Sequence, residues 1–136
     1  MMAKSDTFRC TVITPERAAL DCDAVFVAFP AHDGEMGALY NRAPLLCKLG
    51  IGTLRVESTG EKHTLFVEGG FAQIVDNHLT ILTEQARRPE AIDPAAAEAA
   101  MVEAQAMRIT DEASYVARDK AIRRSRVQLK LVKSRG

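Results

Sequence analysis

The chain has 136 residues, of which 47% are hydrophobic, and it contains no tryptophan. A domain of this length buries roughly two-thirds of its unfolded surface, which suffices for an apolar core without disulfides or metal. Lys and Arg together number 18, as do Asp and Glu, so the net charge indicates no class of partner. No stretch approaches about 18 apolar residues and the start of the chain has no apolar run, so we expect neither a transmembrane helix nor a signal peptide.

The first part of the chain alternates in the manner of β-strands. In residues 7–14, the apolar residues Phe8, Cys10 and Val12 alternate with polar ones. This period of two is typical of a half-buried strand. A second β-prone run covers residues 24–30 and is closed by a proline.

Turn sequences separate the strands that follow. Asp33-Gly34 is a strong hairpin signal. Further strands are predicted around the turn glycines 50–52 and 69–70 and around Asp76-Asn77: residues 44–49, 52–57, 64–68, 71–75 and 79–83. Because strands recur about every ten residues with turns between them, the sequence predicts an antiparallel β-sandwich or barrel.

The composition changes near residue 87, where alanine becomes dominant and glycine disappears until the last residue. Asp93-Pro94 predicts the start of a helix over residues 94–107, with Asp93 as the N-cap. Thr110-Asp111-Glu112 predicts the start of a second helix, residues 112–133, about 33 Å long. The link between them is short, so we expect an antiparallel helical hairpin.

The predicted fold class is therefore α+β, with two domains. Residues 1–86 are expected to form the antiparallel β-sandwich, and residues 87–136 the helical hairpin. The hairpin contains few large apolar residues, so we expect it to be only marginally stable alone.

Positive charge is concentrated at the end of the chain. Residues 118–136 contain eight basic residues and one acidic residue, a formal charge of +7, which leaves −7 on residues 1–117. Such a run is either a solvated helix face or a docking surface for an acidic partner. Nucleic acid is disfavoured, because Tyr115 is the single aromatic residue of the helices and the rest of the chain is acidic.

The three cysteines, Cys10, Cys22 and Cys47, are odd in number and have no CxxC spacing. Buried free thiols in a reducing compartment are the simplest interpretation. Together with the expected lack of a signal peptide and a membrane span, they predict a cytoplasmic protein.

No pattern of catalytic or ligand-binding residues is apparent. The three histidines, at positions 32, 63 and 78, have neither metal-ligand spacing nor a cysteine partner, and the glycines form no phosphate loop. Asp33 and Glu35 are interpreted as part of a hairpin tip and not as a catalytic pair. We predict no catalytic residue, no metal site and no cofactor, and a small enzyme is the least favoured class.

An ordered set of short motifs resembles a known family. The motifs are Thr14-Pro15-Glu16, Gly34-Glu35-Met36-Gly37, Arg42-Ala43-Pro44-Leu45-Leu46, Gly69-Gly70-Phe71 and residues 79–86. In this order and spacing they resemble the epsilon subunit of F-type ATP synthases, called delta in mitochondria. The resemblance covers about residues 7–133 and implies a ten-stranded sandwich followed by two helices.

The resemblance also implies a function. The family subunit is a non-catalytic part of the rotor whose sandwich binds the gamma subunit and the ring of c subunits, coupling rotation of the ring to ATP synthesis. Its helices can extend along gamma and inhibit ATP hydrolysis by meeting an acidic segment of the beta subunit. The protein would lie on the cytoplasmic face of the inner (plasma) membrane, as a peripheral part of the complex without membrane insertion.

Carried over by position, the resemblance assigns Glu35, Met36 and Arg42 to contact with the c ring. It assigns three basic residues of the second helix to the inhibitory contact with beta: Arg123, Arg124 and Arg126.

Two departures from the family pattern stand out. Tyr40-Asn41 replaces the usual Pro-Gly, directly before Arg42, where the family usually has histidine. Some bacterial members bind ATP through the pattern Ile/Leu-Asp-x-x-Arg-Ala in the second helix. The matching stretch here, residues 113–118, lacks the Asp and the Arg-Ala order, and Ile92-Asp93-Pro94 in the first helix resembles only the start of the pattern. The sequence therefore gives little support to ATP binding by the hairpin.

The residues by themselves leave a second hypothesis open. A free-standing module of the same fold would bind an acidic protein or a nucleic acid. Co-purification separates the two hypotheses, because a rotor subunit should bring down gamma and a free module should not.

Overall fold

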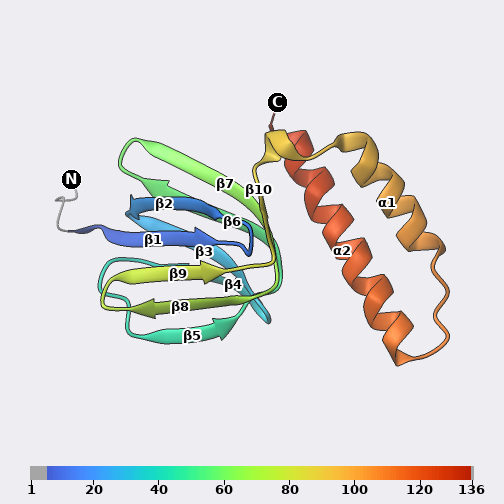
Figure 1. Cartoon of the computed structure of the whole chain (residues 1–136), viewed down its shortest axis with the longest axis horizontal. Coiled ribbons are helices and arrows are strands. Elements are labelled where there is room, and N and C mark those ends of the chain that lie inside the picture. The colour runs from blue at the N-terminus through green and yellow to red at the C-terminus, as the bar shows by residue number, and fades with distance from the viewer. Residues whose placement is uncertain (1–5, 136) are drawn as a thin grey trace. The chain divides into compact units, whose positions relative to one another are not determined.

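The structure is a computed structural model that describes residues 6–135. These residues fall into two units that meet between Ala86 and Arg87. The first unit contains ten strands, β1 to β10, and the second contains the helices α1 and α2 (Figure 1).

The ten strands form two five-stranded sheets. The first sheet contains, in spatial order, β2 (Ala18–Ala24), β1 (Phe8–Ile13), β9 (His78–Leu82), β8 (Phe71–Val75) and β5 (Leu45–Lys48). The second sheet contains β10 (Gln85–Arg87), β7 (Glu61–Glu68), β6 (Ile51–Ser58), β3 (Phe26–Ala31) and β4 (Gly34–Ala38). Neighbouring strands are mainly antiparallel, although β1 and β9 run parallel. The predicted β-sandwich followed by two helices is confirmed.

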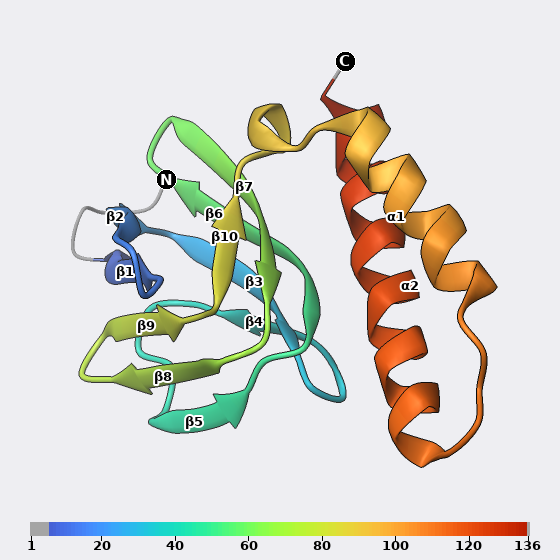
Figure 2. The ribbon, with the colours of Figure 1, turned by 45° about the vertical axis from the view of Figure 1, so that its right-hand side comes forward.

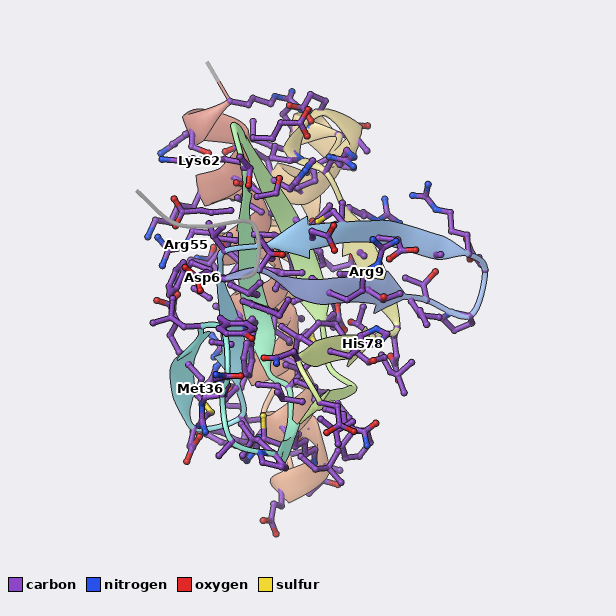
Figure 3. All side chains as sticks on the ribbon, turned by 90° about the vertical axis from the view of Figure 1, so that its left-hand side faces the viewer. Asp6, Arg9, Met36, Arg55, Lys62 and His78 are labelled. Atoms are coloured by element: carbon purple, nitrogen blue, oxygen red, sulfur yellow. The ribbon has the colours of Figure 1, made fainter. Side chains whose placement is uncertain are left out.

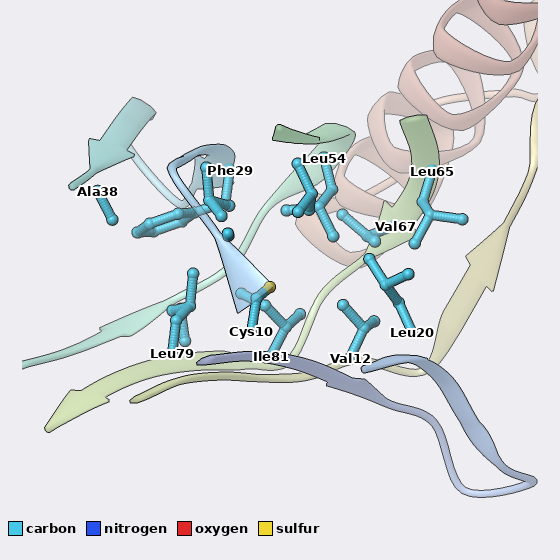
Figure 4. Close-up of a cluster of buried hydrophobic side chains, with 14 of the residues drawn as sticks. Cys10, Val12, Leu20, Phe29, Ala38, Leu54, Leu65, Val67, Leu79 and Ile81 are labelled. Carbon is cyan, nitrogen blue, oxygen red and sulfur yellow. The ribbon is translucent and has the colours of Figure 1, made fainter. Parts of the chain in front are cut away.

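The alternation seen in the sequence places one face of each strand in the core. Cys10 and Val12 of β1 are fully buried, and they pair with Leu79 and Ile81 of β9. Figure 4 shows these side chains opposite those of the second sheet, among them Phe29 and Leu54. Burial of this apolar surface, at about 25 cal/mol per Å², is the main force that holds the two sheets together.

The predicted strands on either side of the glycine turns do not form hairpins. β5 and β6 belong to different sheets, as do β7 and β8, so each connection crosses the sandwich. Two hydrogen bonds join the crossovers. The amide of Gly69 donates to the carbonyl of Gly50 at 3.1 Å, and the amide of Leu49 donates to the carbonyl of Gly70 at 2.8 Å. Gly70 has φ 98°, and a Cβ there would collide with the carbonyl oxygen of Leu82, so this crossover requires glycine.

The resemblance implied ten strands, but no residue pattern indicated the positions of β2 and β10. β2 contains Asp21 and Asp23, which β-propensity disfavours. It pairs with β1 nevertheless, and Arg9 lies opposite Asp23 in the register. β10 has only three residues, too few to give a periodic signal.

The helical unit begins with a short 3-10 helix, η2 (Pro89–Ala91), and continues with α1 (Pro94–Ala106) and α2 (Glu112–Ser134). As predicted, Asp93 is the N-cap of α1, where it accepts from the amide of Ala95 at 3.0 Å. Asp111 caps α2 by accepting from the amide of Ser114 at 2.8 Å, and the Ser114 hydroxyl accepts from the amide of Asp111 in return. The backbone hydrogen bond from Ser114 holds the pKa of Asp111 below its usual value.

The two helices pack side by side and run in opposite directions (Figure 2). The buried residues of the two helices are Ala97 and Ala104 of α1 and Ser125 and Leu131 of α2, of which only Leu131 is large. Arg118 of α2 donates to the carbonyl of Gln105, in the last turn of α1, at 3.4 Å. Small side chains let two helices approach closely but remove little apolar surface from water, so their packing stabilises this unit only modestly.

The described core predicts that replacing two phenylalanines by alanine will have very different effects on the free energy of unfolding. Phe29 is fully buried, whereas Phe71 is 51% exposed. Phe29→Ala should lower the free energy of unfolding of the sandwich by about 3–5 kcal/mol, because it leaves a cavity among packed side chains. Phe71→Ala is the matched control and should cost about 1 kcal/mol or less. Denaturant titration measures both, and equal losses would contradict the described core.

Candidate functional site

Glu35 lies on β4, the edge strand of the second sheet, and its side chain points to solvent. Its Oε1 accepts from Nη2 of Arg55 at 2.9 Å. Arg55 belongs to β6 and reaches across β3, where the small Ala28 lies opposite both Arg55 and Gly37. An exposed ion pair of this kind contributes about 0–1 kcal/mol, so its main effect is to orient the Glu35 carboxylate.

Met36 has a different environment from Glu35. It pairs with Phe29 in the register, and its half-buried side chain packs against the core (Figure 3 labels Met36 and Arg55). Successive residues of a strand point to opposite faces. The structure therefore places Glu35 outside and Met36 inside the sandwich.

Arg42 lies beyond the other end of β4, in the loop of residues 39–44. Its amide donates to the carbonyl of Leu39 at 3.2 Å, which closes a turn with Tyr40 and Asn41 at its centre. Asn41 has φ 64°, whereas Tyr40 is not among the residues with positive φ. This combination is typical of a type II turn, in which glycine or asparagine is preferred at the third position. The turn sequence Tyr40-Asn41 thus adopts the geometry that Pro-Gly favours.

The three predicted arginines of α2 have different surroundings. Nε of Arg123 lies 3.3 Å from Oδ2 of Asp119, one turn earlier in the helix. Arg126 is exposed, and Arg124 is half-buried. The structure thus presents Arg123 and Arg126 to solvent on an otherwise basic segment.

A polar network on the first sheet was missed in the sequence. Arg9 Nε lies 2.7 Å from Oδ1 of Asp21, and Thr11 Oγ1 lies 3.3 Å from the same oxygen and 3.0 Å from Nε2 of His78. Figure 3 shows Arg9 and His78 on neighbouring strands. The hydrogen bond from Arg9 lowers the pKa of Asp21. These residues lie opposite one another across strands, so we assign them a structural role.

Several residues weighed for binding have structural roles as well. The carboxylate of Asp93 caps α1, and the guanidinium of Arg118 bonds to Gln105. The three cysteines are free thiols, but only Cys10 is buried as expected, whereas Cys22 and Cys47 are half-buried. Burial raises the pKa of the Cys10 thiol to about 12, which makes it a poor nucleophile or metal ligand. Within residues 6–135, no group of three or more potential ligands could hold a metal ion. In the same part of the chain, no helix is both long and apolar enough to cross a membrane.

Comparison with known proteins gives a consistent result. The family described as "ATP synthase, Delta/Epsilon chain, beta-sandwich domain" matches residues 7–89. An ATP synthase epsilon chain from Rhodopirellula baltica is 40% identical over 124 residues, which cover 91% of this chain and 97% of the relative. An epsilon chain from a Synechococcus species is 37% identical, with coverages of 95% and 88%.

Solved structures agree with these relatives. One similar chain comes from the mitochondrial ATP synthase of Euglena gracilis, solved as an assembly of OSCP, F1 and c-ring. It superposes with a TM-score of 0.79 at 25% identity, and the match covers 93% of this chain and 81% of the Euglena chain. A chain of the central stalk and c-ring structure from Tetrahymena thermophila shares the fold, with a TM-score of 0.71 at 17% identity and coverages of 91% and 95%. The chain therefore belongs to the delta/epsilon family of ATP synthase, whose members are non-catalytic subunits of the complex.

Proposed function

We propose that this chain is a rotor subunit that couples ion-driven rotation of the c ring to ATP synthesis in the catalytic head. In this proposal the sandwich binds gamma and the c ring, and the two helices restrain ATP hydrolysis by meeting beta. The protein would act at the cytoplasmic face of the membrane as a peripheral part of the complex. The observation that carries the proposal is the match to an epsilon chain over 97% of that relative's length.

The c-ring contact is assigned to charged groups of the sandwich. Glu35 offers a carboxylate that Arg55 orients at 2.9 Å. Arg42 is half-exposed in the loop of residues 39–44. Met36 supports β4 from inside the sandwich, and its own contact with the ring stays a prediction. Charged groups at the rim of a contact set orientation and association rate more than affinity.

The inhibitory contact is assigned to the basic end of α2. The segment 118–136 carries a formal charge of +7, so several weak ion pairs could form together against an acidic surface. Each exposed pair contributes only about 0–1 kcal/mol and is weakened by salt. If the helical hairpin has two docked states that differ by a few kcal/mol, such contacts with a partner are enough to favour one of them.

Co-purification tests the assembly. Tagged full-length protein expressed in its native host should retain both gamma and the c subunits. The double substitution E35A/R42A should keep gamma but lose most of the c subunits, because it removes both charged groups of the proposed contact. Mass spectrometry of the retained chains is the measurement.

The control removes an acidic and a basic residue elsewhere on the sandwich. Glu57 and Lys62 lie 3.7 Å apart on β6 and β7, and E57A/K62A removes one acid and one base in the same way. This variant should retain the c subunits. If the unsubstituted chain retained no gamma, the rotor assignment would be wrong and a free-standing binding module would be favoured. If E35A/R42A retained the ring like E57A/K62A, the contact assignment would be wrong.

Hydrolysis by the assembled complex tests inhibition. Replacing Arg123, Arg124 and Arg126 by alanine should raise ATP hydrolysis and abolish its activation by salt, because the basic end could no longer dock. The control replaces Lys120, Lys130 and Lys133, which removes the same charge from exposed positions of α2. Hydrolysis that is unchanged in the arginine variant, or raised equally in both, would reject a specific arginine contact.

A further inference from the structure

Two tight turns lie together although they are far apart in the sequence. The hairpin between β8 and β9 turns through Asp76 and Asn77, with φ 50° and 58°, and Val75 pairs with His78. Positive φ at both central residues defines a type I′ turn, the connection that suits two antiparallel strands. The other turn is the type II turn at Tyr40 and Asn41.

Asparagine side chains join these turns. The amide N–H of Asn41 donates to Oδ1 of Asn77 at 2.7 Å, and Nδ2 of Asn77 donates to Oδ1 of Asn41 at 3.1 Å. The backbone carbonyl of Asn77 also accepts from the amide of Arg9 at 2.9 Å. Asn77 is thus anchored to β1 on one side and holds the loop of residues 39–44 on the other. We call this pair of hydrogen bonds the Asn41–Asn77 clasp.

The loop needs such a restraint for two reasons. It connects β4 to β5, which belong to different sheets, so its two ends are not held by one hairpin ladder. Asn41 also adopts φ 64°, a region that non-glycine residues enter at a free-energy cost. Hydrogen bonds to a rigid hairpin offset that cost and select one loop conformation.

The restrained loop exposes apolar and charged groups together. Leu39 is 57% exposed and Tyr40 is 36% exposed, and the half-exposed Arg42 lies two residues after Tyr40. Each side chain that becomes ordered only at the moment of binding costs conformational entropy. A loop that is already ordered avoids part of that cost.

We propose that Asn77 is a positioning residue for the c-ring contact: through the Asn41–Asn77 clasp it preorganises the loop that carries Arg42. The inference rests on the proposed function, because the ring is the partner that Arg42 is assigned to meet. The effect of Asn77 acts through the loop and needs no contact between Asn77 and the ring.

The experiment compares two glycine substitutions in one turn. N77G removes the clasp, while D76G changes the neighbouring residue of the same type I′ turn and leaves the clasp intact. Glycine accepts positive φ without strain, so neither substitution should distort the hairpin. N77D is a rescue variant, because its carboxylate can still accept from the Asn41 amide and the Asn41 side-chain amide can rotate to donate to it.

Two readouts are measured on the full-length chain. The first is the hydrogen-exchange rate of the Asn41 amide by NMR. The second is the dissociation constant of the chain, assembled with gamma, for purified c rings in lipid nanodiscs. N77G should accelerate the exchange and weaken binding by about tenfold each, as expected for one or two lost hydrogen bonds. D76G and N77D should stay within about twofold of the unsubstituted protein.

R42A separates failure of the inference from failure of the proposed function. If R42A weakens ring binding but N77G binds like D76G, the positioning role is rejected and the contact stands. If R42A binds like the unsubstituted chain, the contact itself is rejected, and the positioning role with it. Unchanged exchange at Asn41 in N77G would reject the clasp as the restraint on the loop.

Discussion

The inward-facing side chains of the two sheets pack against one another and exclude water, and the other features of the β unit depend on this packing. Residues such as Val12, Ile81 and Leu54 are fully buried in one continuous cluster. Because the chain crosses between the sheets at joined glycine turns, neither sheet can shift in register without breaking both crossovers. A close-packed interior of this kind resists deformation, which suits the coupling role that we propose for this chain.

The same rigid frame holds the groups that we propose for binding. Glu35 is oriented by Arg55 across a strand, and the loop with Arg42 is fixed to the β8–β9 turn through Asn77. The helical unit is built differently, since three of its buried residues are the small Ala97, Ala104 and Ser125, and most of the basic side chains of α2 are exposed. A rigid frame and a weakly packed basic helix pair are the two properties that the proposed coupling and regulation require.

Local patterns in the sequence were sufficient to predict the strand alternation of β1, the hairpin turn at Asp33-Gly34 and the N-cap of α1, because each depends on neighbouring residues. The N-cap of α2 was predicted one residue too early, at Thr110 instead of Asp111. Features that depend on distant residues could not be predicted. The crossover at Gly70 exists because of the Leu82 carbonyl, and the partner of Glu35 depends on the order β6-β3-β4. Asn41 and Asn77 are 36 residues apart, so no local pattern indicates their contact. The family resemblance proposed the site residues, but only the structure showed Met36 facing inward.

Hydrogen exchange along the whole chain tests the central claim, that a self-sufficient sandwich carries a helical unit that can open separately. Amides of β1, β6 and β9 should exchange only through global unfolding. Amides of α1 and α2 should exchange faster, because the helices can open while the strands stay protected. If helix and strand amides instead exchanged at the same opening free energy at every denaturant concentration, the two units would unfold as one and the account would be contradicted.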